Sequence, residues 1–418
     1  MLTRNTLRLP AAFAIAATLL TACGGGGGDS TGADDSASSS AEPIKIGVNL
    51  SSTGFVSSYD LPNLQALKMA VEEYNEKGGI LGRQLELVDA GDNQSKPEQS
   101  AAFAADLIQK GVDVAMTSCD YDVGGPASVE FESEGILSMS VCASSLLYGP
   151  AGGLSLGFSA GDSAAGYAAA AADFGYNDEG WRTAYMLLDN TIAYTKEMCS
   201  SFETRWEELG GTIVGQDTYA QGDQSIQGQL SRILALPEPP DVIRLCTYLP
   251  GLASAVKQIR AAGITAPIIA GSEADGTFWH EGVPNISDFY YTAKASIFGD
   301  DPNEEINEFY ARLGDFAGEP ISDGISVGGY IAIQLLDMAA EEAESLDGAE
   351  LTSVLQELDN VPTLLGPTTF TSELHVAVCR PPAIMEATAP GKVQFVAREA
   401  LTSVPLPESV GGGSLDCS

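Results

Sequence analysis

Few residues in this chain stand in spacings that could support catalysis or bind a metal. There are seven cysteines but only two histidines, His280 and His375, which lie far apart in the sequence. The sequence has no CxxC pair and no zinc-type histidine spacing, and it lacks a nucleophile elbow and a phosphate-binding loop. We therefore predict a protein that is not an enzyme and holds no metal or cofactor, with each histidine in a loop or at the surface.

The first cysteine, Cys23, has a sequence context of its own. Arg4 and Arg8 precede an apolar segment at residues 10–20. This segment is too short to cross a bilayer comfortably, so it is typical of a signal peptide. It leads into Leu-Thr-Ala-Cys, which resembles the bacterial lipobox. We therefore predict a lipoprotein signal peptide over residues 1–22 and lipidation of Cys23, whose thiol is the acylation nucleophile.

The residues after Cys23 have a composition that does not support a packed core. They begin with Gly24–Gly28 and stay rich in Ser, Asp and Ala, so residues 23–42 are predicted to be a flexible tether. The whole chain has 57 acidic and 20 basic residues, for a formal charge of -37. Such a charge repels nucleic acid and anionic lipid headgroups. We expect no nucleic-acid partner, and membrane contact only through a lipid, on the extracytoplasmic face of a bacterial membrane (periplasm or cell surface).

The remaining length and its periodicity predict two α/β lobes. About 375 residues follow the tether, more than one hydrophobic core usually holds. Short β-rich runs alternate with helical segments, which predicts a parallel, doubly wound sheet in each lobe. We assign residues 43–160 and 295–366 to the first lobe and residues 161–294 and 367–418 to the second. Several crossings between them would form a multi-strand hinge, as in a clamshell. The predicted helices are 62–77, 99–110, 126–133, 166–173, 194–209, 224–235, 251–262, 302–313 and 324–345.

Three segments of these lobes carry a family resemblance. The string from Ala70 to Arg83, AVEEYNEKGGILGR, leads into the strand LELV; two shorter segments are Glu132–Leu137 and Lys257–Gly263. Together they resemble the type I periplasmic binding proteins, specifically the branched-chain amino-acid (leucine/isoleucine/valine) type substrate-binding proteins of ABC transporters. The resemblance extends roughly from Ile44 to Phe395. It implies a ligand held between the lobes, beyond the carboxyl ends of the strands, where helix N-termini present N–H groups.

The resemblance also implies which residues contact that ligand. Aromatic residues of the family that line the ligand or close over it correspond to Tyr59, Tyr194 and Tyr248. The acid that binds the ligand amine corresponds to Glu273. The two loops that hold the ligand carboxylate correspond to Asp120, Tyr121, Asp122 and to Cys142, Ala143, Ser144. A hydroxyl and main-chain N–H groups suit an anion, and a carboxylate suits an ammonium. The alternatives are a surface loop for Tyr59 and a solvated loop for Glu273.

Asp120 and Asp122 depart from the family, whose members carry serines there. A carboxylate beside a ligand carboxylate is repulsive in a closed cleft. Either the two aspartates point away and cap the next helix, or the ligand is not a simple amino acid. With Glu273 opposite, an acid-lined cleft would suit a diamine, an amide or another cationic ligand.

The other six cysteines are candidates for disulfides. An even number in an exported chain favours disulfides, although six cysteines allow 15 pairings. Their positions relative to the strands of the two implied lobes favour three pairs: Cys119 with Cys142, Cys199 with Cys246, and Cys379 with Cys417.

Together these features predict a lipid-anchored, monomeric substrate-binding protein. It would capture an amino acid or a related small amine-bearing ligand for the membrane permease of an ABC importer. The alternative is a ligand sensor of the same fold, of the amide, urea or polyamine type, that signals through a partner receptor. A lipid anchor argues against the sensor, since a lipidated protein cannot itself pass a signal through the bilayer.

Overall fold

A computed structural model of the chain describes residues 42–418. The signal peptide, the lipidation site at Cys23 and all but the last residue of the tether lie outside the described residues. Within the described part, no helix is both long enough and apolar enough to span a membrane.

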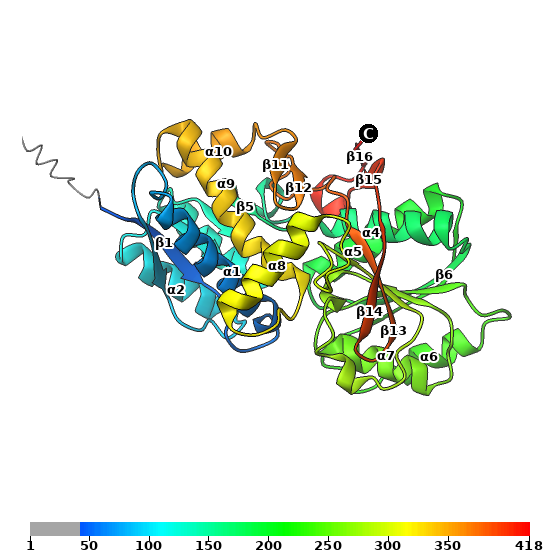
Figure 1. Cartoon of the computed structure of the whole chain (residues 1–418). Helices are drawn as coiled ribbons and strands as arrows, with labels where there is room; N and C mark the ends of the chain where they lie inside the picture. The colour runs from blue at the N-terminus through cyan, green and yellow to red at the C-terminus, as the bar shows by residue number, and fades with distance from the viewer. Residues whose placement is uncertain (1–41) are drawn as a thin grey trace, which may run out of the picture. The chain divides into compact units, whose positions relative to one another are not determined.

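The first sheet has five parallel strands in the order β2-β1-β3-β4-β5. Nearly all residues of β1 and all residues of β3 are buried, as expected for parallel strands that are covered on both faces. The strands are β1 (Ile44–Asn49), β2 (Leu85–Asp89), β3 (Val114–Thr117), β4 (Ser138–Ser140) and β5 (Gly157–Ser159). The helices of this lobe are α1 (Ser57–Glu76), α2 (Pro97–Gln109), α3 (Tyr121–Ser133), α8 (Glu304–Ala317), α9 (Val327–Ala343) and α10 (Gly348–Leu355). Figure 1 shows α1 and α2 beside β1.

The second sheet has seven strands in the order β14-β13-β10-β9-β8-β6-β7. Its strands are β6 (Thr183–Asp189), β7 (Thr212–Tyr219), β8 (Val242–Cys246), β9 (Ile268–Ala270), β10 (Phe289–Ala293), β13 (Ala383–Ala389) and β14 (Lys392–Arg398). Its helices are α4 (Ala164–Asp173), α5 (Ala193–Glu208), α6 (Gln227–Leu234) and α7 (Gly251–Ala261), which lie around this sheet in Figure 1. The α/β fold with two sheet-based lobes agrees with the sequence prediction.

The second sheet is mixed, whereas the sequence analysis predicts only parallel strands. Strands β6 to β10 are parallel, but β13 pairs antiparallel with β10 and with β14. Ala293, the last residue of β10, pairs with Ala383, the first of β13, so the chain leaves and re-enters the sheet at the same end. Strand β14 follows through a tight turn in which Gly391 has a φ of 71°, and strands joined by such a turn must be antiparallel.

Two small hairpins complete the chain. Strands β11 (Val361–Thr363) and β12 (Gly366–Thr368) form one, and β15 (Ser403–Pro405) and β16 (Ser414–Asp416) form the other. The first hairpin bonds to α9 through Gln334, whose side chain accepts the N–H of Leu364, and β15 packs on α4 and α5. The β15–β16 hairpin thus packs on helices of the second lobe, whereas the predicted lobe boundary between residues 366 and 367 falls within β12.

Helix α1 begins earlier than predicted. The apolar spacing predicts a helix from Pro62, but the helix begins at Ser57 and includes Pro62. The additional residues bring Tyr59 and Asp60 onto the helix, both of them buried. At its other end Gly79 has a φ of 82°, and a Cβ atom there would collide with the carbonyl of Arg83. The glycines of the AVEEYNEKGGILGR string are therefore required by the turn itself.

Candidate functional site

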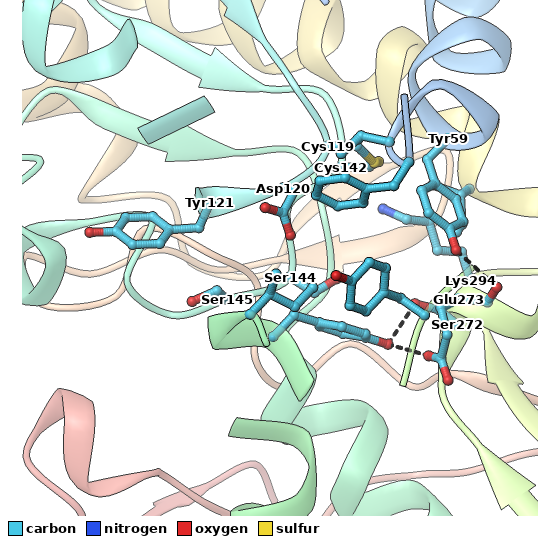
Figure 2. Close-up of a pocket in the computed structure, with 16 residues that line it drawn as sticks. Tyr59, Cys119, Asp120, Tyr121, Cys142, Ser144, Ser145, Ser272, Glu273 and Lys294 are labelled. Carbon is cyan, nitrogen blue, oxygen red and sulfur yellow. Dashed lines mark hydrogen bonds between the residues drawn. A yellow bond between two sulfur atoms is a disulfide. The ribbon is translucent and has the colours of Figure 1, made fainter. Parts of the chain in front are cut away.

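One cavity collects residues that follow the carboxyl ends of strands in both lobes, where open α/β sheets bind ligands. Its lining comprises Phe55, Val56, Tyr59, Cys119, Asp120, Tyr121, Cys142, Ser144, Ser145, Ile192, Tyr194, Tyr248, Ser272, Glu273, Lys294 and Ile325. All the ligand contacts predicted from the sequence line this cavity except Asp122 and Ala143. Figure 2 shows Asp120, Glu273 and Lys294 around the same space, with the ring of Tyr121 directed away from it.

Glu273 follows β9 in a short 3-10 turn, and its side chain is buried rather than solvated. One carboxylate oxygen accepts the hydroxyl of Tyr194 at 2.7 Å, and the other accepts the N–H of Gly271 at 3.1 Å. Burial raises the pKa of Glu273, while these two hydrogen bonds and the positive charge of Arg244 oppose the rise. The carboxylate is therefore oriented by fixed donors, and each oxygen keeps capacity for a further donor.

Arg244 is a fully buried cation on β8 that acts on Glu273 from outside the cavity lining. Its guanidinium donates to the carbonyl of Ala270 at 3.0 Å and lies over the ring of Phe202. Burial lowers the pKa of Arg244 to about 10, and the nearby Glu273 opposes that shift. The opposite charges of Arg244 and Glu273 therefore act on each other at a distance, because among residues 42–418 no ion pair joins them and the Nε and Nη2 atoms of Arg244 have no hydrogen-bond partner.

Tyr59 joins the two lobes through its hydroxyl. It donates to the main-chain oxygen of Glu273 at 3.2 Å and accepts the N–H of Leu249 at 3.2 Å. Burial raises the pKa of Tyr59 well above its ordinary value, so the hydroxyl stays protonated. Tyr59 is thus a buried lobe-bridging residue and not a surface-loop residue.

Asp120 occupies the N-cap position of α3, but its side chain makes no capping hydrogen bond. It is 8 % exposed and lines the cavity, and its Oδ1 atom has no hydrogen-bond partner among residues 42–418. Burial raises the pKa of Asp120 to about 8, with a smaller contribution from the negative charge of Asp122. Of the two alternatives for Asp120, the structure therefore has the one in which its side chain faces the cavity and does not cap α3.

Asp122 does cap a helix, but not the one that contains it. Its Oδ2 accepts the N–H of Ala193 at 2.9 Å, at the start of α5 in the second lobe. Helix α5 has no side-chain cap from its own N-cap residue, Ile192. Ala143 is also outside the lining and is fully buried beneath it. Neither residue meets the cavity, because each side chain is engaged in packing or bonding elsewhere.

Lys294 is the charged cavity residue that the sequence analysis does not identify. It directly follows β10, is 2 % exposed, and donates to the carbonyl of Ala160 at 3.5 Å. Burial lowers the pKa of Lys294 to about 8. A signal was available in the sequence, since a lysine ends an apolar strand at a predicted lobe boundary. Ser145, Ser272 and the apolar lining residues carry no comparable signal.

The six cysteines of residues 42–418 are joined in the pairs that the sequence analysis favours. Cys119 and Cys142 follow the neighbouring strands β3 and β4, with their Cα atoms 4.6 Å apart, and both line the cavity. Asp60 positions the first of these by accepting its main-chain N–H at 2.8 Å. This disulfide therefore belongs to the wall of the site.

Both histidines are buried rather than at the surface, and of the two His375 lies in a loop while His280 begins a 3-10 turn. His375 stacks on Phe158, with ring centroids 3.8 Å apart, and its Nδ1 bonds to the carbonyl of Gly157. His280 accepts the N–H of Gly391. Aromatic packing and main-chain bonds hold each ring in the interior. Over residues 42–418, no cluster of His, Cys, Asp and Glu is arranged to hold a metal ion.

Comparison with known proteins identifies the family. A family profile described as periplasmic binding protein matches residues 43–392, most of the chain. The chain belongs to the periplasmic binding protein family. Members of this family are solute-binding proteins that act outside the cytoplasm, and they are not enzymes. The sequence-based predictions of family and of a binding role are therefore confirmed.

Relatives of this periplasmic binding protein differ in what they are named to bind. The Leu/Ile/Val-binding protein BraC3 of Rhizobium johnstonii is 25 % identical over 332 residues, covering 78 % of this chain and 87 % of the relative. The branched-chain amino acid transporter substrate binding protein LivJ of Streptococcus pneumoniae, solved with isoleucine, has a TM-score of 0.74 at 22 % identity, covering 86 % and 99 %. A solute binding protein of R. palustris, solved with benzoate, has a TM-score of 0.73 at 20 % identity, covering 88 % and 99 %. The likenesses to solved structures establish a shared fold.

Proposed function

We propose that this solute-binding protein captures an amino acid or a related small amine-bearing ligand for an ABC importer. The observation that carries the proposal is Glu273, a buried carboxylate with fixed orientation at the wall of an aromatic-lined cavity. A buried carboxylate is a strong partner for a ligand ammonium group, because the bond is charge-assisted. The names of BraC3 and LivJ support the same class of ligand.

In this proposal the residues around the cavity have distinct roles. Glu273 binds the ligand amine, Tyr194 orients that carboxylate, and Tyr248 contributes an aromatic wall. Ser144 offers a hydroxyl to the ligand. Closing of the two lobes about their connecting segments encloses the ligand, and the Tyr59 hydroxyl stabilises the closed arrangement.

The cellular setting follows from the same proposal. The protein acts as a monomer on the outer side of a bacterial membrane and delivers its ligand to a membrane permease. The lipobox-like sequence at Cys23 supports a lipid anchor, and residues 23–42 supply the tether. Membrane fractionation of cells that express wild type or Cys23→Ala tests the anchor. Retention of the variant in the membrane fraction would exclude it.

Thermal-shift screening followed by isothermal titration tests the ligand class. The panel contains the proteinogenic amino acids, polyamines, short amides, urea and benzoate, the last because of the R. palustris relative. A ligand present at 100 times its dissociation constant stabilises the folded state by about 2.7 kcal/mol. We expect amine-bearing compounds to bind to the wild type. Glu273→Gln should weaken their binding and leave the affinity for neutral amides unchanged. Binding of benzoate alone would contradict the proposal.

A further inference from the structure

Lys294 lies where the three segments that connect the lobes converge. It begins the segment 294–303, and its ammonium reaches the carbonyl of Ala160 in the segment 160–163. Asp162 of that segment pairs with Arg380, which lies in the third connecting segment, 369–382. The lysine side chain also lines the cavity, so its charge is presented both to the connecting segments and to the ligand space.

No carboxylate in residues 42–418 forms an ion pair with Lys294. Among the acidic residues, Asp162 has the largest effect on the pKa of Lys294. Both carboxylate oxygens of Asp162 already have other partners, namely Arg380 and the hydroxyl of Tyr167. An ammonium group has three donors, and Lys294 uses one of them in a bond at the long limit of 3.5 Å. A buried charge without a counter-ion is costly unless something else pairs with it.

The acids of the cavity are complementary to this unpaired cation. Asp120 is nine-tenths buried and has an oxygen without a hydrogen-bond partner among residues 42–418. Neither Asp120 nor Glu273 forms a salt bridge with Lys294, whose ammonium group instead donates to the carbonyl of Ala160. The cavity therefore presents an ammonium group and two carboxyl groups that form no ion pair with one another. Figure 2 shows the three side chains entering the same space from different elements.

We propose that Lys294 binds the carboxylate of the ligand, so that the ligand is a free amino-acid zwitterion whose ammonium group faces Asp120 and Glu273. This inference rests on the proposed function and narrows it: amines, polyamines and amino-acid amides lack the group that Lys294 requires. It also resolves the conflict between Asp120 and a ligand carboxylate. The carboxylate binds beside the connecting segments, and Asp120 becomes a partner of the ammonium group.

Matched ligand panels test the inference by isothermal titration at pH 7. The probes are the proteinogenic L-amino acids, their C-terminal amides and the corresponding decarboxylated amines. In the wild type we expect amino acids to bind at least about 30-fold more tightly than their amides, as for a buried charge pair that loses one partner. In Lys294→Met that preference falls to within about threefold. Lys294→Arg keeps the positive charge and should retain most of the preference for amino acids over their amides. Lys257→Met, at an exposed position on α7, is the matched control.

Each outcome bears on the inference. If the wild type binds amides or amines as tightly as amino acids, the inference is overturned, and no variant is needed. If Lys294→Met keeps the full preference for amino acids, Lys294 is a structural residue only and the inference is again overturned. If no amine-bearing compound binds the wild type, the proposed function fails first, and the inference fails with it.

Discussion

Asp122 of the first lobe accepts the N–H of Ala193 at 2.9 Å and so caps helix α5 of the second lobe. The residue that precedes α5, Ile192, cannot provide a cap, so this helix end depends on a carboxylate from the other lobe. The two residues that flank Ala193 in the chain both line the cavity. Lobe contact and the geometry of the cavity wall are therefore connected through one hydrogen bond.

Asp122→Ala should destabilise the contact between the lobes. Loss of a capping carboxylate costs about 1 kcal/mol, and the favourable interaction with the helix dipole is lost with it. We expect a lower free energy of unfolding by that amount and about fivefold weaker ligand binding, measured by chemical denaturation and calorimetry. Glu134→Ala, an exposed acid at the end of α3, is the control and should change neither quantity. Unchanged binding in Asp122→Ala would show that the contact plays no part in closing.

Tyr59→Phe should weaken ligand binding without a large loss of packing. The variant removes only the hydroxyl, which leaves the buried N–H of Leu249 without its acceptor. An unsatisfied buried donor costs about 1–3 kcal/mol, so we expect the dissociation constant to rise roughly 5- to 100-fold. Tyr176→Phe is a suitable control, because its hydroxyl forms no hydrogen bond within residues 42–418. Equal affinities for wild type and Tyr59→Phe would contradict the bridging role.

The stability of the ligand-free protein should fall as the pH rises through the titration of Asp120. Burial raises the pKa of Asp120 from 3.8 to about 8. The contribution of this carboxyl group to the free energy of unfolding is therefore fully present below pH 3.8 and is lost as the pH rises to 8. The buried histidines act in the opposite sense, because burial lowers the pKa of His280 and of His375 to about 4. The pH dependence of stability that the histidines cause ends near pH 6.5, the ordinary pKa of histidine. A change in stability between about pH 6.5 and 8 therefore reports on the buried acids.

Asp120→Asn isolates this contribution. Each pKa unit corresponds to about 1.4 kcal/mol, so we expect the stability of the variant relative to wild type to increase by about 1–2 kcal/mol from pH 6.5 to 8. Chemical denaturation at several pH values measures it. Asp92→Asn should show no such trend, because the pKa of Asp92 is lowered to about 2 by hydrogen bonds that include the Thr53 hydroxyl, against the effect of desolvation. Parallel pH profiles for wild type and Asp120→Asn would rule out an elevated pKa at Asp120.

Removal of the Cys119–Cys142 disulfide should affect binding as well as stability. Its cysteines are 23 residues apart in the sequence, and closing a loop of this size stabilises a protein by about 3 kcal/mol. We expect Cys119→Ala with Cys142→Ala to lower the free energy of unfolding and also to weaken ligand binding, because both residues line the cavity. Cys379→Ala with Cys417→Ala should lower stability alone. Non-reducing peptide mapping of the wild type would contradict the premise if it found other pairs.

Much of the architecture could be predicted because it depends on local periodicity. The alternation of β-rich and helical segments predicted nearly all helices of both lobes, often within two or three residues. Two errors had non-local causes. The start of α1 depends on Asp60, which accepts the N–H groups of Ser51 and Cys119 and so favours a helix that begins before Pro62. The antiparallel β13 depends on where the chain re-enters the second sheet.

The candidate site could be predicted in part, since its loops follow strands that the sequence identifies. The directions of its side chains could not be predicted. Asp120 and Asp122 are two residues apart on the same turn, yet one faces the cavity and the other caps a helix of the opposite lobe. Lys294 was missed because its importance depends on the cavity and on Asp162 and Arg380, which are distant in the sequence.

The amino-acid sequence by itself determined the family, the two α/β lobes and the loops that contain the site, because periodicity and short motifs reflect interactions between residues that are close along the chain. Only the tertiary structure decided which charges enter the cavity and which are already paired. Burial and pairing arise from segments hundreds of residues apart, as for Tyr59 with Glu273. The tertiary structure therefore decides that the cavity combines Asp120 and Glu273 with the unpaired ammonium of Lys294.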